Sequence, residues 1–475
     1  MSNTLKIRNP RNGQFDYEIR VTESADISAI AAELRAAQPA WRDLGVEGRI
    51  TVLERFKNAL ANNADAIVAA LSADTGRHAL AKGELGGLIG SIERWCSIAP
   101  DIAAESERSS KTMPGVTIRE EFAPYPLLGA ISPWNFPLLL SFIDVVPALL
   151  AGTAVIVKPS EVTPRFTAPV TASIEKVPEL RDVLRFVHGD GRSGAALIDH
   201  VDVVAFTGSV ATGKKVAVAA AERFIPAFLE LGGKDPVVLL EGTDLERAAT
   251  AILRASVAAT GQACQSLERI YVHESQHDEF VALLTDKAKA APLSHPDPHQ
   301  GIIGPLIFAR QAEIIDTHLE DAVTKGATVH CGGKVTELDG GLWVAPTVLS
   351  GVNHSMAVMS EETFGPVMPV MSFGTEDEAL RLANDSRYGL SGAVFGPTEA
   401  DALRVARQLD AGGVSVNDAG MTTMIFEAKK SAFKYSGMGP SRMGPTGMSR
   451  FFRHKALYIN RGDVVPLSVM AEGTG

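Results

Sequence analysis

The sequence predicts an α/β protein with two doubly wound domains, each built on a largely parallel sheet. Short apolar segments rich in β-branched residues alternate with helical segments from about residue 127 onward, which is typical of parallel sheets covered on both faces. The alternation is interrupted at Gly232-Gly233 and then begins again. A chain of 475 residues is also too long for one ordinary core, so two or three domains are expected.

The segments before this alternation differ in kind. Residues 26–110 have the apolar spacing of successive amphipathic helices. Residues 115–128 (GVTIREEFAPYPLL) are expected to form a β-hairpin that lies outside both domains. The apolar stretch 137–159 has Asp144 near its middle and is divided by Gly152-Thr153. It therefore predicts a buried helix followed by a buried strand in preference to a membrane-spanning helix.

The strands expected in each domain follow from their apolar, β-branched composition. In the first domain they are TAVIVKP, LRFVHGD, VDVVAFTGS and PAFLELGG. In the second domain they are DPVVLL, ERIYVH, ATVH, GPVMPVMSFG and GGVSVN. Helices are expected between the strands, among others around 244–258 and 276–289.

Composition favours a soluble enzyme with small-molecule partners. The 45 basic and 56 acidic residues give a net charge of −11, and no Lys/Arg run exceeds two residues, so no nucleic-acid partner is expected, nor a membrane partner. The first residues contain no apolar segment of a secretory signal. Cys96, Cys264 and Cys331 are odd in number and far apart, which does not suit a disulfide framework. A reducing cytoplasm is the expected location.

Two glycine-rich segments are close to nucleotide-binding motifs without completing them. Gly189–Gly194 fits GxGxxG after a strand, but no acidic residue follows where the adenosine ribose would need one. A glycine-shaped loop around Gly191, near a bound nucleotide, is still expected. Gly208–Lys215 nearly matches the phosphate-binding loop GxxxxGK[ST], but Lys215 stands where a hydroxyl must hold Mg²⁺. A P-loop-like NTPase is therefore the alternative from another class of enzyme.

A third segment, His273–His277, matches the zinc-protease pattern HExxH, which needs both histidines on one face of a helix. Here His273 ends a strand, and Ser275 is expected to cap the next helix. We therefore expect a solvated corner and no metal site.

Three residues carry side chains that acyl chemistry requires. Cys264 lies in GQAC between a helix and a strand, where it is either a nucleophile or a small buried apolar group. Glu230 follows an apolar strand and precedes two glycines, where an α/β enzyme places a base, although exposure on a turn fits equally well. Asn135, held between aromatic residues and prolines, can donate to an oxyanion or cap a turn.

Six segments together resemble one family. The aldehyde dehydrogenase superfamily has the same segments in the same order and spacing: PWNFP (133–137), KPSE (158–161), FTGS (206–209), LELGG (229–233), GQAC (261–264) and EETFGPV (361–367). The resemblance runs from about residue 26 to about residue 460. It implies two Rossmann-like domains and a small β oligomerisation element, in a homodimer or homotetramer.

The resemblance also implies how the chain is divided. The expected parts are an NAD-binding domain of residues 1–112 and 129–231, a catalytic domain of residues 232–432, and an oligomerisation element of residues 113–128 and 447–475.

The chemistry that the resemblance implies is hydrolytic, without transfer of the acyl group to coenzyme A. Cys264 would attack the aldehyde carbon, the Asn135 amide would bind the oxyanion, and Glu230 would activate the water that hydrolyses the thioester. NAD is the expected cofactor and NADP the alternative, because a 2′-phosphate would lie against the Glu161 carboxylate.

Residues for the cofactor come from the same segments. By resemblance, Lys158 and Glu161 would bind the adenosine ribose, Ser209 the pyrophosphate and Glu362 the nicotinamide ribose. Further contacts are expected from Trp134, Ser160, Gly191, Gly208, Leu231 and Phe364.

Departures from the family pattern bear on the substrate. Asp144 stands where many relatives have a lysine, and SAFKYSGMGP (431–440) replaces PFGGxKxSGxGR. Apolar residues after Asn135 and after Asn417 are expected to line the substrate tunnel, and the second of these loops has no basic residue before Lys429. An uncharged, largely apolar aldehyde, aliphatic or aromatic, is therefore expected. A semialdehyde substrate and a non-catalytic structural homologue are the alternatives.

Overall fold

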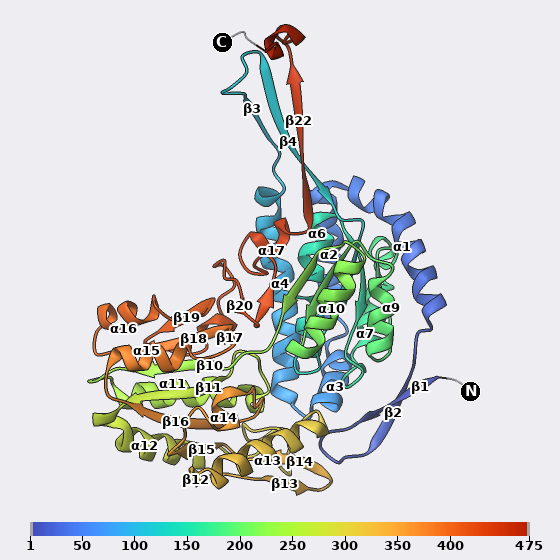
Figure 1. Cartoon of the computed structure of the whole chain (residues 1–475). Coiled ribbons are helices and arrows are strands. Elements are labelled where there is room, and N and C mark those ends of the chain that lie inside the picture. The colour runs from blue at the N-terminus through green and yellow to red at the C-terminus, as the bar shows by residue number, and fades with distance from the viewer. Residues whose placement is uncertain (1–2, 473–475) are drawn as a thin grey trace.

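The computed structural model of the chain describes residues 3–472 and shows two α/β lobes with an arm that projects from the first (Figure 1). The first lobe is built on a six-stranded sheet, in the order β21 (Gly437–Met438), β9 (Ala227–Glu230), β8 (Val203–Thr207), β5 (Leu127–Ile131), β6 (Ala154–Lys158) and β7 (Leu184–Phe186). Neighbouring strands are parallel except for β21, which runs antiparallel to β9. Strands β6 and β8 are buried along their whole length because helices cover both faces of the sheet.

Helices of the first lobe come mainly from the first half of the chain. They are α1 (Ser24–Asp43), α2 (Gly45–Ala61), α3 (Ala64–Thr75), α4 (His78–Ile102), α5 (Pro137–Phe142), α6 (Val145–Ala151), α7 (Thr167–Ile174), α8 (Pro178–Arg181), α9 (Gly191–Ile198), α10 (Val210–Glu222) and, near the C-terminus, α17 (Thr446–Ser449). The amphipathic helices expected before residue 110 are α1 to α4. The apolar stretch 137–159 forms α5, α6 and β6, with a break between the helices at Ile143-Asp144. Within residues 3–472 no helix combines the length and apolarity needed to cross a membrane.

The second lobe is built on a seven-stranded sheet. Its order is β12 (Thr328–Cys331), β15 (Thr347–Ser350), β16 (Val367–Phe373), β11 (Leu267–His273), β10 (Asp235–Leu239), β18 (Ser391–Phe395) and β19 (Gly413–Val416). All neighbours are parallel except β12 and β15. The five strands expected here are present, and β15 and β18 add to them. Both lobes therefore confirm the doubly wound α/β prediction.

The remaining elements of the second lobe cover this sheet or extend from it. The helices are α11 (Leu245–Val257), α12 (His277–Lys289), α13 (Ala309–Thr324), α14 (Ala357–Ser360), α15 (Glu376–Asn384) and α16 (Glu399–Ala406), and the short 3-10 turns are η1 (Ala258–Gly261), η2 (Glu274–Gln276) and η3 (Met421–Thr423). Two-stranded pairs are β13 (Val335–Leu338) with β14 (Gly341–Val344) and β17 (Tyr388–Gly389) with β20 (Phe433–Lys434). An N-terminal pair that the sequence did not predict, β1 (Thr4–Arg8) with β2 (Phe15–Arg20), reaches the second lobe, where Arg8 Nη2 donates to the Gly340 carbonyl (3.2 Å).

The arm is a three-stranded antiparallel sheet, β22 (Phe452–Asn460), β4 (Val116–Pro124) and β3 (Ser106–Ser109), followed by η4 (Leu467–Met470). The expected hairpin over residues 115–128 is wrong. Residues 116–124 form one strand that pairs with β3 and β22, and β5 begins at Leu127 in the first sheet. The physical reason is burial, because residues 127–130 are fully buried between β6 and β8, whereas a hairpin on the arm would leave them in water. Leu127 and Leu128 therefore lie in the first lobe, and β3 lies in the arm.

The chain passes from one sheet to the other between Glu230, which ends β9, and Asp235, which begins β10. This crossing lies at Gly232-Gly233, where the sequence predicted the junction. The carboxyl end of β9 and the start of β10 therefore bring residues of both lobes together, and the candidate site lies there.

Candidate active site

Cys264 follows a turn whose backbone is unusual. Ala259, Thr260 and Gly261 have φ values of 53°, 62° and 67°, a left-handed conformation that is costly for the branched Thr260. The Thr260 hydroxyl donates to the Gly304 carbonyl (3.2 Å) and accepts from the Gly304 N–H (2.9 Å), which holds the turn in place. A Cβ on Gly261 would lie 2.3 Å from the Gly365 backbone, so only glycine allows the Cys264 turn to approach the 361–367 segment this closely.

Asn135 is buried beside this turn. Its Nδ2 donates to the Gln262 carbonyl (2.9 Å), two residues before Cys264. Arg77 donates to the Asn135 carbonyl and, through Nη1, to the Ala259 carbonyl (3.0 Å), so it ties the two segments together. Because an amide nitrogen carries two hydrogens, one Asn135 N–H remains for a further acceptor.

Glu230, at the end of β9, lies next to a buried charge cluster. Its Oε1 is 3.9 Å from Arg442 Nε, a buried nitrogen that makes no hydrogen bond within the described part of the chain. Arg442 Nη2 donates to the Thr207 hydroxyl (2.7 Å) and to Asp144 (2.7 Å), and Arg450 also pairs with Asp144. Burial opposes ionisation of Asp144, yet the two arginines hold the pKa of its carboxyl below the ordinary value. Asp144 therefore stabilises the arginine that neighbours Glu230.

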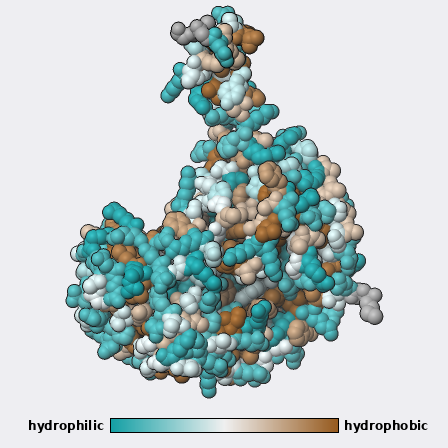
Figure 2. Space-filling model, in the orientation of Figure 1, coloured by the Kyte–Doolittle hydropathy of each residue, from teal (hydrophilic) through white to brown (hydrophobic). Residues whose placement is uncertain are grey.

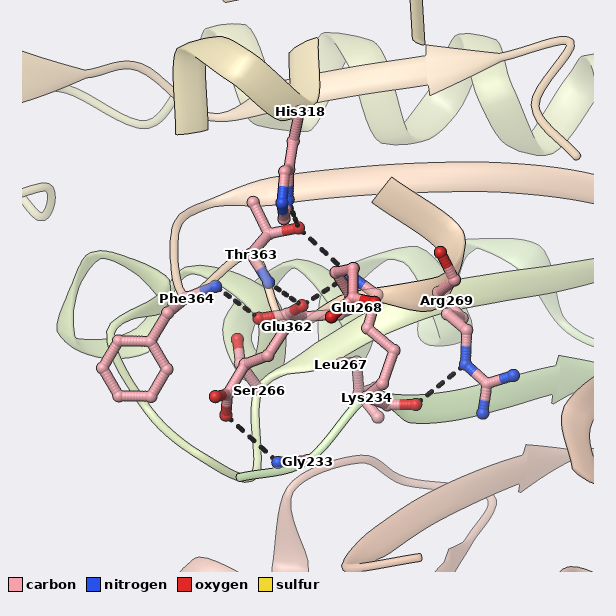
Figure 3. A network of polar contacts seen from close by, with 12 residues as sticks. Gly233, Lys234, Ser266, Leu267, Glu268, Arg269, His318, Glu362, Thr363 and Phe364 are labelled. Atoms are coloured by element: carbon pink, nitrogen blue, oxygen red, sulfur yellow. Dashed lines mark hydrogen bonds and ion pairs between the residues drawn. The ribbon is translucent and has the colours of Figure 1, made fainter. Parts of the chain in front are cut away.

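The loop that carries Glu362 and Phe364 is fixed by a buried network around Glu268 (Figure 3). Glu268 accepts from the backbone N–H groups of Thr363 (2.7 Å) and Phe364 (2.8 Å) and from Lys234 Nζ (2.6 Å). Lys234 also donates to the Thr363 hydroxyl (3.0 Å). Glu362 itself accepts from the Gly233 N–H (3.1 Å), so the loop is joined to the crossing between the lobes. Burial, and then the Glu268 charge, raise the pKa of Glu362 to about 8.

The charges around Cys264 disfavour its thiolate. Burial raises the pKa of the Cys264 thiol to about 12, the carboxylates of Glu362 and Asp235 add to this effect, and Lys430 opposes it. Asp235 is itself buried, which raises its pKa to about 7. The sulfur therefore favours its protonated thiol form.

Several predicted cofactor residues lie at one edge of the first sheet. Lys158 ends β6, Gly208 and Ser209 follow β8, and Trp134 follows β5, so all stand at the carboxyl ends of adjacent parallel strands. An open α/β sheet binds dinucleotides at this edge. Lys158 Nζ donates to Glu161 Oε2 (3.0 Å), with the ammonium buried and the carboxylate partly exposed.

The remaining predicted cofactor residues complete the same region. Ser209 caps α10, whose N-terminal amides suit a phosphate, and the rings of Trp134 and Phe364 meet edge to face at 5.3 Å. Leu231 packs on Gly213, where an added Cβ would lie 2.4 Å away.

Gly191 begins α9, with Asp190 as its cap, and the Ser160 hydroxyl accepts from the Val162 N–H (3.2 Å). A cation, two carboxylates, a helix N-terminus and two aromatic rings fit the chemistry of a nicotinamide dinucleotide.

The glycine-rich segments have structural roles in the described chain. Gly189–Gly194 leads into α9, and Gly208–Lys215 forms the capped start of α10. In the HExxH segment, His273 ends β11 and its ring accepts from the Ser275 N–H, so His273, not Ser275 as expected, caps the turn that follows. His277 begins α12, so the two histidines do not share a helical face. Within residues 3–472 no cluster of three His, Cys, Asp or Glu side chains could hold a metal ion.

The contacts that five residues make at the site were not predicted from the sequence: those of Arg77, Gln262, Glu268, Lys430 and Arg442. One of them had a visible signal, because Glu268 and its neighbour Arg269 place two charges inside the strand LERIYVH, which is buried up to Val272. The sequence has no basic residue in the loop between Asn417 and Lys429, and the structure brings the next residue, Lys430, to the site, since its Nζ donates to Gln265 (3.2 Å), the neighbour of Cys264. In the same loop Met424 and Ile425 are 55% and 44% exposed, so they are not core residues.

Comparison with known proteins identifies the same family throughout. The sequence profile of the "Aldehyde dehydrogenase family" matches residues 1–457. A 4,4'-diapolycopene aldehyde oxidase of a Methylomonas species is 38% identical over 424 residues, which cover 87% of this chain and 78% of the relative. The structure of a putative aldehyde dehydrogenase, PutA, from Anabaena variabilis has 52% sequence identity and a TM-score of 0.96, covering 98% of this chain and 99% of that one. A Mycobacterium tuberculosis aldehyde dehydrogenase solved with NAD⁺ has 31% identity and a TM-score of 0.90, covering 98% and 96%.

Proposed function

This chain belongs to the aldehyde dehydrogenase family, and from that premise we propose that it oxidises an aldehyde to a carboxylic acid through a thioester on Cys264. The observation that carries the proposal is the hydrogen bond from Asn135 Nδ2 to the Gln262 carbonyl (2.9 Å). It fixes an amide donor beside the turn of Cys264, at the crossing where Glu230 ends its strand. A nucleophile, an oxyanion donor and a base are the groups that hydrolytic aldehyde oxidation requires.

The proposed cofactor is NAD, which supplies the acceptor for the hydride when it is bound. Lys158 and Glu161 would hold the adenosine ribose, the amides after Gly208 the pyrophosphate, and Glu362 the nicotinamide ribose. A 2′-phosphate beside Glu161 would cost about 1–4 kcal/mol at effective dielectrics of 80 to 20. Because Lys158 already neutralises that carboxylate in part, we propose a preference for NAD over NADP and not an exclusive requirement.

The first chemical step uses Cys264 and Asn135. Once a base has taken the thiol proton, the Cys264 sulfur attacks the aldehyde carbon, the C–S bond forms, the C=O π bond breaks, and the carbonyl oxygen becomes an oxyanion. The second Asn135 N–H and the Cys264 backbone N–H would donate to that oxyanion, and one such donor is typically worth about 10²–10³ in rate. Loss of hydride from the same carbon leaves a thioester on Cys264.

Hydrolysis of the thioester is the role proposed for Glu230. The carboxylate takes a proton from a water whose oxygen attacks the acyl carbon, the C–S bond breaks, and the acid leaves. Arg442 Nε lies 3.9 Å from Glu230 Oε1, so a cation stands beside the carboxylate proposed to accept this proton. One aldehyde, one water and one NAD⁺ thus give one carboxylic acid, one NADH and one proton.

Two substitutions test this assignment by following NADH. Cys264→Ala should abolish oxidation while NAD binding, measured by calorimetry, persists, because other residues hold the cofactor. Glu230→Gln should release about one NADH per active site and then stall as the acyl-enzyme. Cys96→Ala and Cys331→Ala are the matched controls and should keep most activity, since neither thiol lies at the site. Steady turnover by Cys264→Ala would overturn the mechanism, and kcat/KM with NADP equal to that with NAD would overturn the cofactor preference.

The parts of the chain have proposed roles that follow from this mechanism. The first lobe would bind the cofactor, the second would carry the nucleophile, and the arm would join copies of the chain in a homodimer or homotetramer. A cytoplasmic location is proposed as well, because three free cysteines suit a reducing compartment.

A further inference from the structure

Lys430 lies in a loop that passes directly beside the nucleophile. Its backbone N–H donates to the Ser441 hydroxyl (3.1 Å), which fixes the loop. Its Nζ donates to Gln265 Oε1 (3.2 Å), and the Thr422 hydroxyl donates to the same oxygen (2.5 Å). Since Gln265 immediately follows Cys264, these contacts hold an ammonium group close to the residue on which the thioester is proposed to form.

This ammonium group differs from the other buried lysines around the site. Lys158 contacts Glu161 (3.0 Å) and Lys234 contacts Glu268 (2.6 Å). Within residues 3–472, no carboxylate lies within ion-pair distance of Lys430, and its Nζ donates to a neutral amide. An ammonium carries three hydrogens, so two of them remain for a ligand.

Charge nearby explains why the position favours an anion. Burial lowers the pKa of Lys430, while Glu230, Cys264 and Asp235 act in the opposite direction from farther away. A partly buried cation without a paired carboxylate costs free energy, and a bound anion removes that cost. The site thus has a built partner for a negative group close to the reacting carbon.

We infer that Lys430 binds a carboxylate of the substrate, and that the preferred substrate is a semialdehyde with its carboxylate a few carbons from the aldehyde. The inference rests on the proposed function, since it names the substrate class of the same site. It favours the semialdehyde, which the sequence left as the alternative to an uncharged, apolar aldehyde.

The experiment compares one charged and one uncharged aldehyde of similar length, succinic semialdehyde and pentanal, with NAD. For the wild type we expect kcat/KM to favour the semialdehyde by at least about tenfold. Lys430→Met should reduce that preference by about tenfold or more, mainly through KM, the size expected for one hydrogen bond between charged groups. Lys430→Arg keeps the charge and should restore most of the preference, and thermal melting verifies that each variant folds.

Lys429→Met is the matched control, because the neighbouring Lys429 side chain is exposed and the preference should not change. Equal losses of kcat/KM for both aldehydes in Lys430→Met would overturn the inference, since Lys430 would then act on the Cys264 thiolate and not on the substrate. A wild type that oxidises pentanal as well as the semialdehyde would also overturn it while the proposed function stands. A wild type that oxidises neither would overturn both.

Discussion

At the scale of single residues, the Cys264 sulfur lies among carboxylates that keep it protonated while no cofactor is bound. Its pKa of about 12 exceeds the ordinary value of 9.0 through burial first and then through Glu362 and Asp235. A thiol is a weak nucleophile until it is deprotonated. The raised pKa therefore predicts that the Cys264 thiol resists oxidation and alkylation while no cofactor is bound.

The alkylation rate of Cys264 should report this protection. Because pH 8 lies far below the thiol pKa, the thiolate fraction and the rate with iodoacetamide should rise about tenfold per pH unit between pH 8 and pH 10. Bound NAD⁺, whose nicotinamide ring is cationic, should accelerate the reaction at pH 8. Peptide mass spectrometry separates Cys264 from Cys96 and Cys331. A fast rate that does not change with pH would mean that the thiolate exists before the cofactor binds.

Sequence reasoning found the residues of the site that lie in motifs and missed those that reach it from elsewhere. The composition of the surrounding segment predicts a turn or a strand end at each of three residues, Asn135, Glu230 and Cys264. Arg442 contacts Asp144 across 298 residues and Lys430 contacts Gln265 across 165, and nothing in their neighbouring residues indicates those partners. Which charges pair over a long range depends on how distant segments pack together, and a local sequence pattern carries no information about that packing.

At the scale of elements, the start of α5 depends on a side chain of α4. Glu84 Oε2 accepts from the backbone N–H groups of Leu138 (3.0 Å) and Leu139 (3.1 Å), two donors that a helix leaves unpaired at its N-terminus. The other oxygen, Oε1, is buried and makes no hydrogen bond within residues 3–472. Burial raises the pKa of Glu84 to about 7, against the opposing effect of Leu139, Arg77 and Leu138. This helix begins at Pro137, two residues after Asn135, so the cap also fixes the segment that carries the proposed oxyanion donor.

Glu84→Gln should therefore change stability in a pH-dependent way. A carboxyl whose pKa is raised on folding contributes stability that is present below the unfolded pKa of 4.5 and lost as pH rises to about 7. Gln keeps an acceptor for α5 and does not ionise, so Tm of the variant minus Tm of the wild type should increase between pH 5 and pH 8.5, by a shift on the order of 2 °C. Glu93→Gln, an exposed acid on the same helix, is the control and should show a constant difference. A constant difference for Glu84→Gln would contradict the raised pKa.

The sequence predicted a helix or strand correctly where one face or the whole element is buried. It did so less well where the side chains are only partly buried. Helices α1 to α4 follow the apolar spacing of residues 26–110, and β6 and β8 are uninterrupted apolar runs. Strand β4 is half-buried along most of its length, and its partner β22 lies more than 300 residues later, so the local sequence suggested a hairpin with its own neighbour. The four-residue strand β15 is too short for its period to be recognised.

At the scale of the whole molecule, the three-stranded sheet of the arm stands clear of the two lobes (Figure 2). Most of β22 is exposed, Tyr458 by 73%, and the segment beyond it exposes Val464, Leu467 and Met470 by more than 80%. A sheet with so little burial gains little stability by itself. A second copy of the chain that covers the arm would supply the missing burial.

Light scattering should accordingly give the wild type a mass of at least twice 50.3 kDa. Tyr458→Glu places a charge on the exposed arm, so it should lower the mass or the concentration range over which the oligomer persists. Ile302→Ser is the control, an exposed apolar residue (63%) outside the arm, and should leave the mass unchanged. A monomeric wild type at micromolar concentration would contradict this role of the arm.

The pairing of Asp144 with Arg442 and Arg450 also sets the order in which a growing chain can become an enzyme. The two arginines are synthesised 298 and 306 residues after their partner, and β21, the edge strand beside Glu230, is made just before them. At about 5–20 residues per second, a ribosome needs about 15–60 s to cover that distance. Until the two arginines have been synthesised, the Asp144 carboxylate at the start of α6 has to be hydrated by water. The first lobe, most of which is translated before the second, is therefore completed only after the second lobe has been synthesised.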